Sequence, residues 1–126
     1  MEDTARFVIH RHKTGKSHFD LRLVMGERLR CWSILRDPVC LPGEKRLAIE
    51  RESAPAQNLN QSTFTEEAFG TGRVFVWDAG TFKISAQAAE VIVLEFSGKK
   101  LSGPYELRHM RWYPGNRWLL KNMSRA

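Results

Sequence analysis

"RFVIHRHKTGKSHFDLRLV", residues 6–24, consists of two short runs in which apolar and polar side chains alternate, joined by a polar turn that contains glycine. Alternation with a period of two is typical of half-buried β-strands, and such a turn favours an antiparallel hairpin. Pairing around residues 13–17 sets His12 opposite His18, His10 opposite Asp20, and Val8 opposite Arg22. All six side chains then share one face of the hairpin.

The opposite face of this hairpin is apolar. It carries Phe7, Ile9, Phe19, Leu21 and Leu23. The two faces differ so strongly that we expect the apolar one to pack on a core.

Similar alternating runs recur along the whole chain, separated by Gly, Pro and Asn. Nine candidate strands result, at residues 6–10, 18–24, 29–35, 45–50, 72–78, 81–84, 90–96, 105–110 and 117–121. Short turns between them, including one at 78–80, predict an all-β fold with little helix, a barrel or a sandwich. The polar stretch 53–63 is expected to be a surface loop that runs into one helical turn at 65–69.

Size predicts a single domain over residues 1–126, and the charge balance is the one expected of a surface that meets polyanions, although many basic proteins bind nothing acidic. The chain has 20 Lys and Arg against 14 Asp and Glu, a net charge of +6 and a pI near 9.7. Cys31 and Cys40 match no paired zinc spacing. No leader peptide or membrane-length apolar run is recognisable, so we expect a reduced, cytoplasmic protein that does not enter a membrane.

The polar face of the hairpin suits a metal site. Two imidazoles, His12 and His18, and the carboxylate of Asp20 form a mixed N/O set that fits Mn²⁺, Zn²⁺ or another first-row metal. Arg22, one strand step beyond Asp20, is placed to hold a phosphate oxygen. The alternative is a hairpin whose polar face simply meets solvent.

"FVIHRHKTGKSHFDLRL" resembles the signature of the 3'-phosphoesterase domain of bacterial DNA ligase D. The similarity continues in order through "CWSILRDP", "PGEKRLAIERE", "FGTGRVFVWDAGTF", "LEFSGKKLSGPYELRHM" and "WLLKN". The resemblance implies a compact antiparallel β-barrel of eight or nine strands. It also implies a metal-dependent enzyme, best with Mn²⁺, that removes a terminal ribonucleoside or phosphate from the 3' end of a primer during DNA repair.

Carried over motif by motif, the resemblance assigns roles to five residues. It implies His12, His18 and Asp20 as metal ligands, with Arg22 and Arg46 against the scissile phosphate.

The chain also departs from the family pattern. Ala54 stands where the family has a phosphate-contacting histidine, and Asn58 where it has a tyrosine. His10 replaces a usual glutamine, and His10 and Glu52 are accessory candidates. These departures predict weak activity, or a module that binds 3' ends without cleaving them.

The C-terminal region interleaves basic and aromatic residues, a composition suited to phosphates and unpaired bases. Arg111, Arg117 and Lys121 are candidate nucleic-acid contacts. Expected partners are the 3' ends of DNA or RNA–DNA primer-templates, and by analogy a DNA ligase or polymerase. A barrel that binds protein or structured RNA without metal is a third interpretation.

Overall fold

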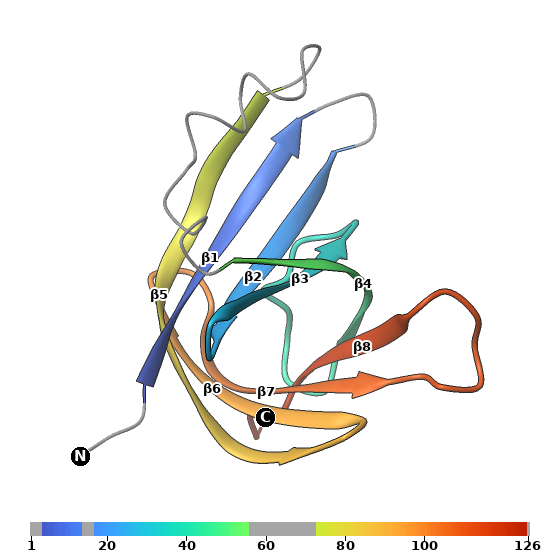
Figure 1. Cartoon of the computed structure of the whole chain (residues 1–126). Helices are drawn as coiled ribbons and strands as arrows, with labels where there is room; N and C mark the ends of the chain where they lie inside the picture. The colour runs from blue at the N-terminus through green and yellow to red at the C-terminus, as the bar shows by residue number, and fades with distance from the viewer. Residues whose placement is uncertain (1–3, 14–16, 56–72, 126) are drawn as a thin grey trace.

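Eight antiparallel strands close into one barrel (Figure 1). The computed structural model describes residues 4–13, 17–55 and 73–125, except the side chains of residues 13, 54–55 and 73–75. The strands are β1 (Thr4–Lys13), β2 (His18–Met25), β3 (Arg28–Ile34), β4 (Lys45–Pro55), β5 (Arg73–Ala88), β6 (Val91–Gly98), β7 (Ser102–His109) and β8 (Arg117–Asn122).

Around the barrel the order is β1-β2-β3-β4-β8-β7-β6-β5, and β5 pairs with β1 to complete it. Closure removes the unpaired edges that an open sheet would expose. The expectation of an antiparallel barrel is therefore confirmed, and the sandwich alternative is excluded. The described part of the chain contains no helix, and so none that could cross a membrane.

The predicted turn at residues 78–80 was wrong, because two expected strands are one. β5 runs without interruption through Asp78 and Gly80. A Cβ on Gly80 would lie 2.3 Å from the Ser97 carbonyl oxygen, so glycine serves here for close approach of β6. The buried Asp78 carboxylate accepts hydrogen bonds from the backbone N–H groups of residues 99–101. Gly80 thus allows β6 to approach β5, and Asp78 joins β5 to the turn between β6 and β7.

The loop expected at 53–63 also begins later than predicted, because β4 continues through Pro55. Residues 56–63 and the helical turn expected at 65–69 lie outside the described residues.

The barrel interior holds the core. The apolar face of the first hairpin is part of this core, and Ile9, Leu21 and Leu23 are 0% exposed. Trp32 on β3 and Trp118 on β8 meet edge to face, with ring centroids 5.6 Å apart. The expectation that the hairpin's apolar face packs on a core is confirmed.

Candidate metal and phosphate site

The register of the β1–β2 hairpin is the one its sequence predicts. His12 pairs with His18, His10 with Asp20, and Val8 with Arg22. The polar face is nevertheless not a solvated one. His10, His12 and Asp20 are 1%, 3% and 5% exposed, so these polar side chains are as buried as parts of the core. Burial of a carboxylate and two imidazoles is costly unless each finds partners.

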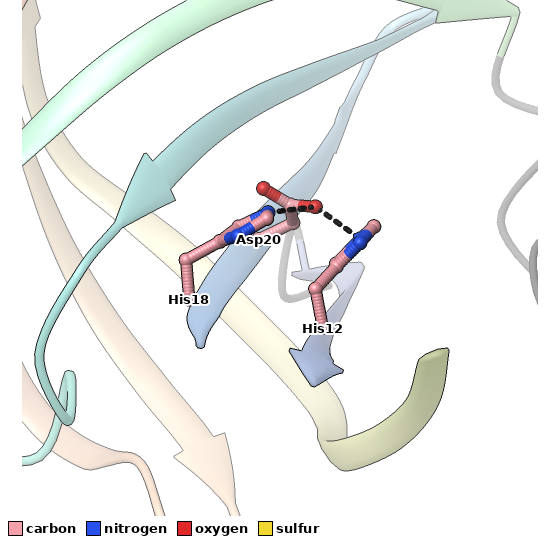
Figure 2. A group of neighbouring side chains, drawn as sticks. All are labelled: His12, His18 and Asp20. Atoms are coloured by element: carbon pink, nitrogen blue, oxygen red, sulfur yellow. Dashed lines mark ion pairs between the residues drawn. The ribbon is translucent and has the colours of Figure 1, made fainter. Parts of the chain in front are cut away.

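His12 and His18 both have the Asp20 carboxylate as a partner. His12 Nε2 lies 2.5 Å from Asp20 Oδ2, and His18 Nε2 lies 3.6 Å from the same oxygen. Figure 2 shows both ion pairs running to the Asp20 carboxylate from the two neighbouring strands. The imidazoles of His12 and His18 are stacked, with ring centroids 4.4 Å apart. The three side chains therefore converge on one point beside β1 and β2.

The donor set fits a divalent transition metal. His12, His18 and Asp20 each offer one ligand atom, and these atoms lie within 4.8 Å of one another. First-row metals bind imidazole nitrogen and carboxylate oxygen at about 2.0–2.2 Å, so two ligands of one ion are separated by at most ~4.4 Å. Small side-chain adjustments bring all three atoms into that range. Three protein ligands leave coordination positions open for water or a phosphate oxygen.

Asp20 is held in its ionised form. Burial alone would raise its pKa, but hydrogen bonds with His12 and Ser33, together with the charges of His12 and Arg22, outweigh it. The pKa falls from 3.8 to about 2. Ser33, opposite Asp20 on β3, donates from Oγ to Asp20 Oδ1 at 2.7 Å. This leaves Oδ2 directed at the two histidines.

Arg22 stands beside Asp20 on the same face of β2. Its Nη2 is 3.7 Å from Asp20 Oδ2, and its Nε donates to His10 Nδ1 at 3.0 Å. Burial and the Arg22 charge lower the pKa of His10 from 6.5 to about 4, so His10 is neutral. A neutral imidazole that accepts at Nδ1 carries its proton on Nε2. His10 therefore anchors Arg22 through Nε, and the terminal nitrogens of the guanidinium remain directed at the Asp20 side of the site, with Nη2 facing the carboxylate.

These residues line an open cleft on the outer face of β1–β4, which is referred to below as the cleft. Its lining is His12, His18, Asp20, Arg22, Cys31, Ser33, Arg51 and Glu52. Four residues named from the sequence as ligands or phosphate contact lie in it together, with the accessory candidate Glu52. His10 lies against Arg22 but is not part of the lining.

Arg46 is not brought into the cleft. Its Nε donates to the Asp37 carbonyl and its Nη1 to the Lys45 carbonyl, and Nη2 lies 3.8 Å from Glu44. The reason is strand parity. Arg46 has the same parity as Ala48, which is buried in the core, so it starts from the opposite face of β4 to Arg51. Glu52 shares this parity but reaches the cleft because it follows the register shift in the pairing of β3 with β4.

Sequence reasoning missed Ser33 and Arg51. Ser33 Oγ accepts a hydrogen bond from Arg51 Nε at 3.1 Å while it donates to Asp20. A signal existed in the alternation of "KRLAIERE", which puts Arg51 on the face opposite Arg46. It could not be used without knowing that β3 pairs with both β2 and β4.

Cys31 lies in the cleft lining between Arg22 on β2 and Arg51 on β4. Burial raises the pKa of its thiol to about 12, in spite of the two arginines. The thiolate is the reactive form of cysteine, so a neutral thiol argues against a covalent role. Cys31 acts as a small buried side chain between two cations.

The three basic residues proposed for nucleic acid lie on another part of the barrel. Arg111 pairs with Glu90 at 3.4 Å, and Arg117 lies over the Tyr113 ring at 5.4 Å. Lys121 lines a second pocket on β4, β7 and β8, with Lys45 and Arg108. In the strand order, β8 is separated from β2 by β3 and β4. None of the three joins the cleft.

The positions at which the chain departs from the family pattern are described only in part. Ala54 pairs with Leu29 near the end of β4, beyond a register shift in the pairing of β3 with β4. Asn58 lies outside the described residues.

The fold and site define a class of protein: an antiparallel β-barrel whose outer face carries two histidines, a carboxylate and arginines around one cleft. Comparison with known proteins gives the family. Residues 10–109 match the model of the DNA ligase D 3'-phosphoesterase domain, and the chain belongs to this family.

Its relatives are larger proteins. The chain is 30% identical over 108 residues to the multifunctional non-homologous end joining protein LigD of Pseudomonas aeruginosa, which covers 81% of this chain and 13% of that protein. It is also 31% identical over 131 residues to the multifunctional non-homologous end joining protein LigD of Mycobacterium bovis. That alignment covers 97% of this chain and 17% of the Mycobacterium bovis protein. The chain thus spans less than a fifth of the length of these relatives.

Proposed function

We propose that this protein is a metal-dependent phosphoesterase that processes the 3' ends of DNA primer-templates in DNA repair. Its substrates would be a 3'-terminal ribonucleotide or a 3'-phosphate. Family membership supports a role in DNA end processing, and the curated relatives are described as non-homologous end joining proteins. One observation carries the chemistry: the ligand atoms of His12, His18 and Asp20 converge beside the guanidinium of Arg22.

In this proposal His12, His18 and Asp20 hold the ion, with Mn²⁺ as the metal that the family resemblance implies. When bound, a divalent metal neutralises a phosphate oxygen and lowers the pKa of a coordinated water. Asp20 is suited to the role because it is ionised and its Oδ1 is already occupied by Ser33. Hydrogen bonds of this kind to a ligand orient it and tune its basicity.

Arg22 holds the phosphate. Its terminal nitrogens can donate two parallel hydrogen bonds to phosphate oxygens and offset the charge that develops during displacement. His10 fixes the guanidinium plane through Nε. Glu52 is the second carboxylate in the cleft lining, and we assign it the part of proton acceptor or water-orienting group. Arg46 has no part in this arrangement.

The test is incubation of the pure protein and Mn²⁺ with a labelled primer-template that ends in one ribonucleotide or in a 3'-phosphate. We expect a product with a 3'-OH end in wild type and none with His18→Ala. Ends that stay intact in wild type, with metal binding and fold confirmed, would exclude the phosphoesterase.

A second function is favoured by Ala54, which replaces the family's phosphate-contacting histidine. Here the protein binds 3' ends without cleaving them, as an accessory to a DNA ligase or polymerase. General acid–base groups and phosphate contacts typically contribute ~10²–10⁴-fold to rate, so their loss can silence an enzyme.

Restoring the missing groups separates the two functions. For a weak enzyme, Ala54→His combined with Asn58→Tyr should raise the rate in Mn²⁺ at least ~10-fold, the low end of the range expected for such groups. For a binding module, the double variant should remain inactive, because the surrounding loop does not place the two restored groups against the phosphate. Product formation by wild type itself would decide for the enzyme.

Binding to the duplex is proposed for the basic residues outside the cleft. Arg111, Arg117 and Lys121 would contact backbone phosphates away from the 3' end. Each contact made by a cation adds roughly −0.9 to the slope of log affinity against log salt. Lys121→Gln should therefore reduce this slope by about 1, measured by fluorescence anisotropy on primer-template DNA.

A further inference from the structure

Arg51 has no counterpart among the residues that the family resemblance assigns to the phosphate, yet it lines the cleft. Across the barrel wall, Arg22 pairs with Cys31 and Cys31 pairs with Arg51. The two arginines thus occupy one transverse row, separated by a single strand. Since neighbouring strands are ~4.8 Å apart, their backbones are about 10 Å from each other. Side chains that point to one face over that span can reach a common anion.

Arg51 and Arg22 are held in the same way. Arg51 Nε donates to Ser33 Oγ, and Arg22 Nε donates to His10 Nδ1. In both cases the anchored atom is Nε. Among the described residues, no group accepts a hydrogen bond from the terminal nitrogens of Arg51. Terminal nitrogens form the fork that binds phosphate bidentately.

The two arginines also flank the same carboxylate. Arg22 Nη2 approaches Asp20 Oδ2, and Ser33 connects Arg51 to Asp20 Oδ1. An anion next to Asp20 therefore has a guanidinium on either side. Arg51 is exposed to solvent, whereas Arg46 is occupied by backbone carbonyls at another place on β4.

We propose that Arg51 is the second phosphate-binding arginine of the cleft, working with Arg22 on the terminal phosphate and taking the role that the resemblance implies for Arg46. This inference rests on the proposed function for its substrate, a 3'-terminal phosphate. In this chain the arginine pair therefore comes from β2 and the far part of β4.

The experiment compares the affinities of primer-templates that end in 3'-phosphate and in 3'-OH, measured in EDTA so that no turnover occurs. The ratio of the two affinities isolates the contact to the terminal phosphate from contacts to the duplex. Arg51→Ala should lower the preference for 3'-phosphate by roughly 10-fold, the loss expected for a charge-assisted hydrogen-bonded pair. Arg51→Lys, which keeps the charge but not the fork, should fall between Arg51→Ala and wild type.

Arg108→Ala is the matched control, because it removes an exposed arginine from β7 without touching the cleft and should leave the ratio unchanged. Ser33→Ala tests whether Arg51 acts only indirectly, through its connection to Asp20 by way of Ser33. It removes the anchor between Arg51 and Asp20, so it should weaken Mn²⁺ binding more than it lowers the phosphate preference. An unchanged ratio in Arg51→Ala, or a ratio that falls equally in Arg108→Ala, overturns the assignment of Arg51.

Turnover in Mn²⁺ is measured separately on the same variants. If wild type leaves 3' ends intact but its phosphate preference depends on Arg51, the phosphoesterase fails and the assignment of Arg51 stands. If wild type processes ends and Arg51→Ala does so at the same rate, the phosphoesterase stands and the assignment fails.

Discussion

Both faces of the β1–β2 hairpin contain buried side chains, but the two faces are held by different forces. The inner face, with Leu21 and Ile9, lies in the core and is stabilised by removal of apolar surface from water. The outer face, with His10, His12 and Asp20, is stabilised by ion pairs and hydrogen bonds among its own members. Burial by itself therefore does not separate structure from function. The chemistry of the buried atoms does.

The largest effect is expected on the inner face. Leu21→Ala should lower the free energy of unfolding by about 2–5 kcal/mol, because it removes apolar contacts and leaves a cavity in a closed core. Urea denaturation followed by tryptophan fluorescence measures this. Leu41→Ala is the control, since the same truncation at 69% exposure should change stability by no more than about 0.5 kcal/mol. Similar losses for both variants would mean that Leu21 is not a core residue.

A substitution on the outer face should change metal binding strongly and stability little. His18→Ala is expected to weaken Mn²⁺ binding by at least about 100-fold, while the urea midpoint changes little. This loss exceeds the one that is typical when a residue that only hydrogen-bonds to a metal ligand is removed. Titration calorimetry of Mn²⁺ gives the affinity. His109→Ala, which removes a histidine whose ring is tilted against that of Trp118 with centroids 4.9 Å apart, should retain wild-type affinity. Equal affinity of wild type and His18→Ala would refute the metal site.

The smallest effect is expected at His10, which belongs to the outer face but is neither a proposed metal ligand nor part of the cleft lining. His10→Ala should reduce the preference for a 3'-phosphate end by up to about 10-fold, because Arg22 loses the acceptor that orients it. His10→Gln, the family's usual residue, offers a carbonyl oxygen to the same Nε and should restore most of the preference. A purely structural His10 would lose stability in both variants and recover nothing with glutamine.

Much of the candidate site could be predicted from the sequence because it lies in one hairpin. His12, His18, Asp20 and Arg22 are within a few positions of a turn, so local pairing rules were enough to place them on one face. The error at residues 78–80 has a local cause as well. Asp78 and Gly80 are residues that favour turns, but the pairing of β5 with β1 and β6 overrides this preference.

By itself the sequence determined the hairpin, its register and the apolar face, since a period of two is a property of neighbouring residues on one strand. Only the tertiary structure decided which strands lie side by side. Closing the barrel in the order β1-β2-β3-β4 brought Ser33 behind Asp20 and Arg51 level with Arg22, and left Arg46 at another place. Contacts between distant strands depend on closure of the whole sheet, and alternation along one strand carries no record of them.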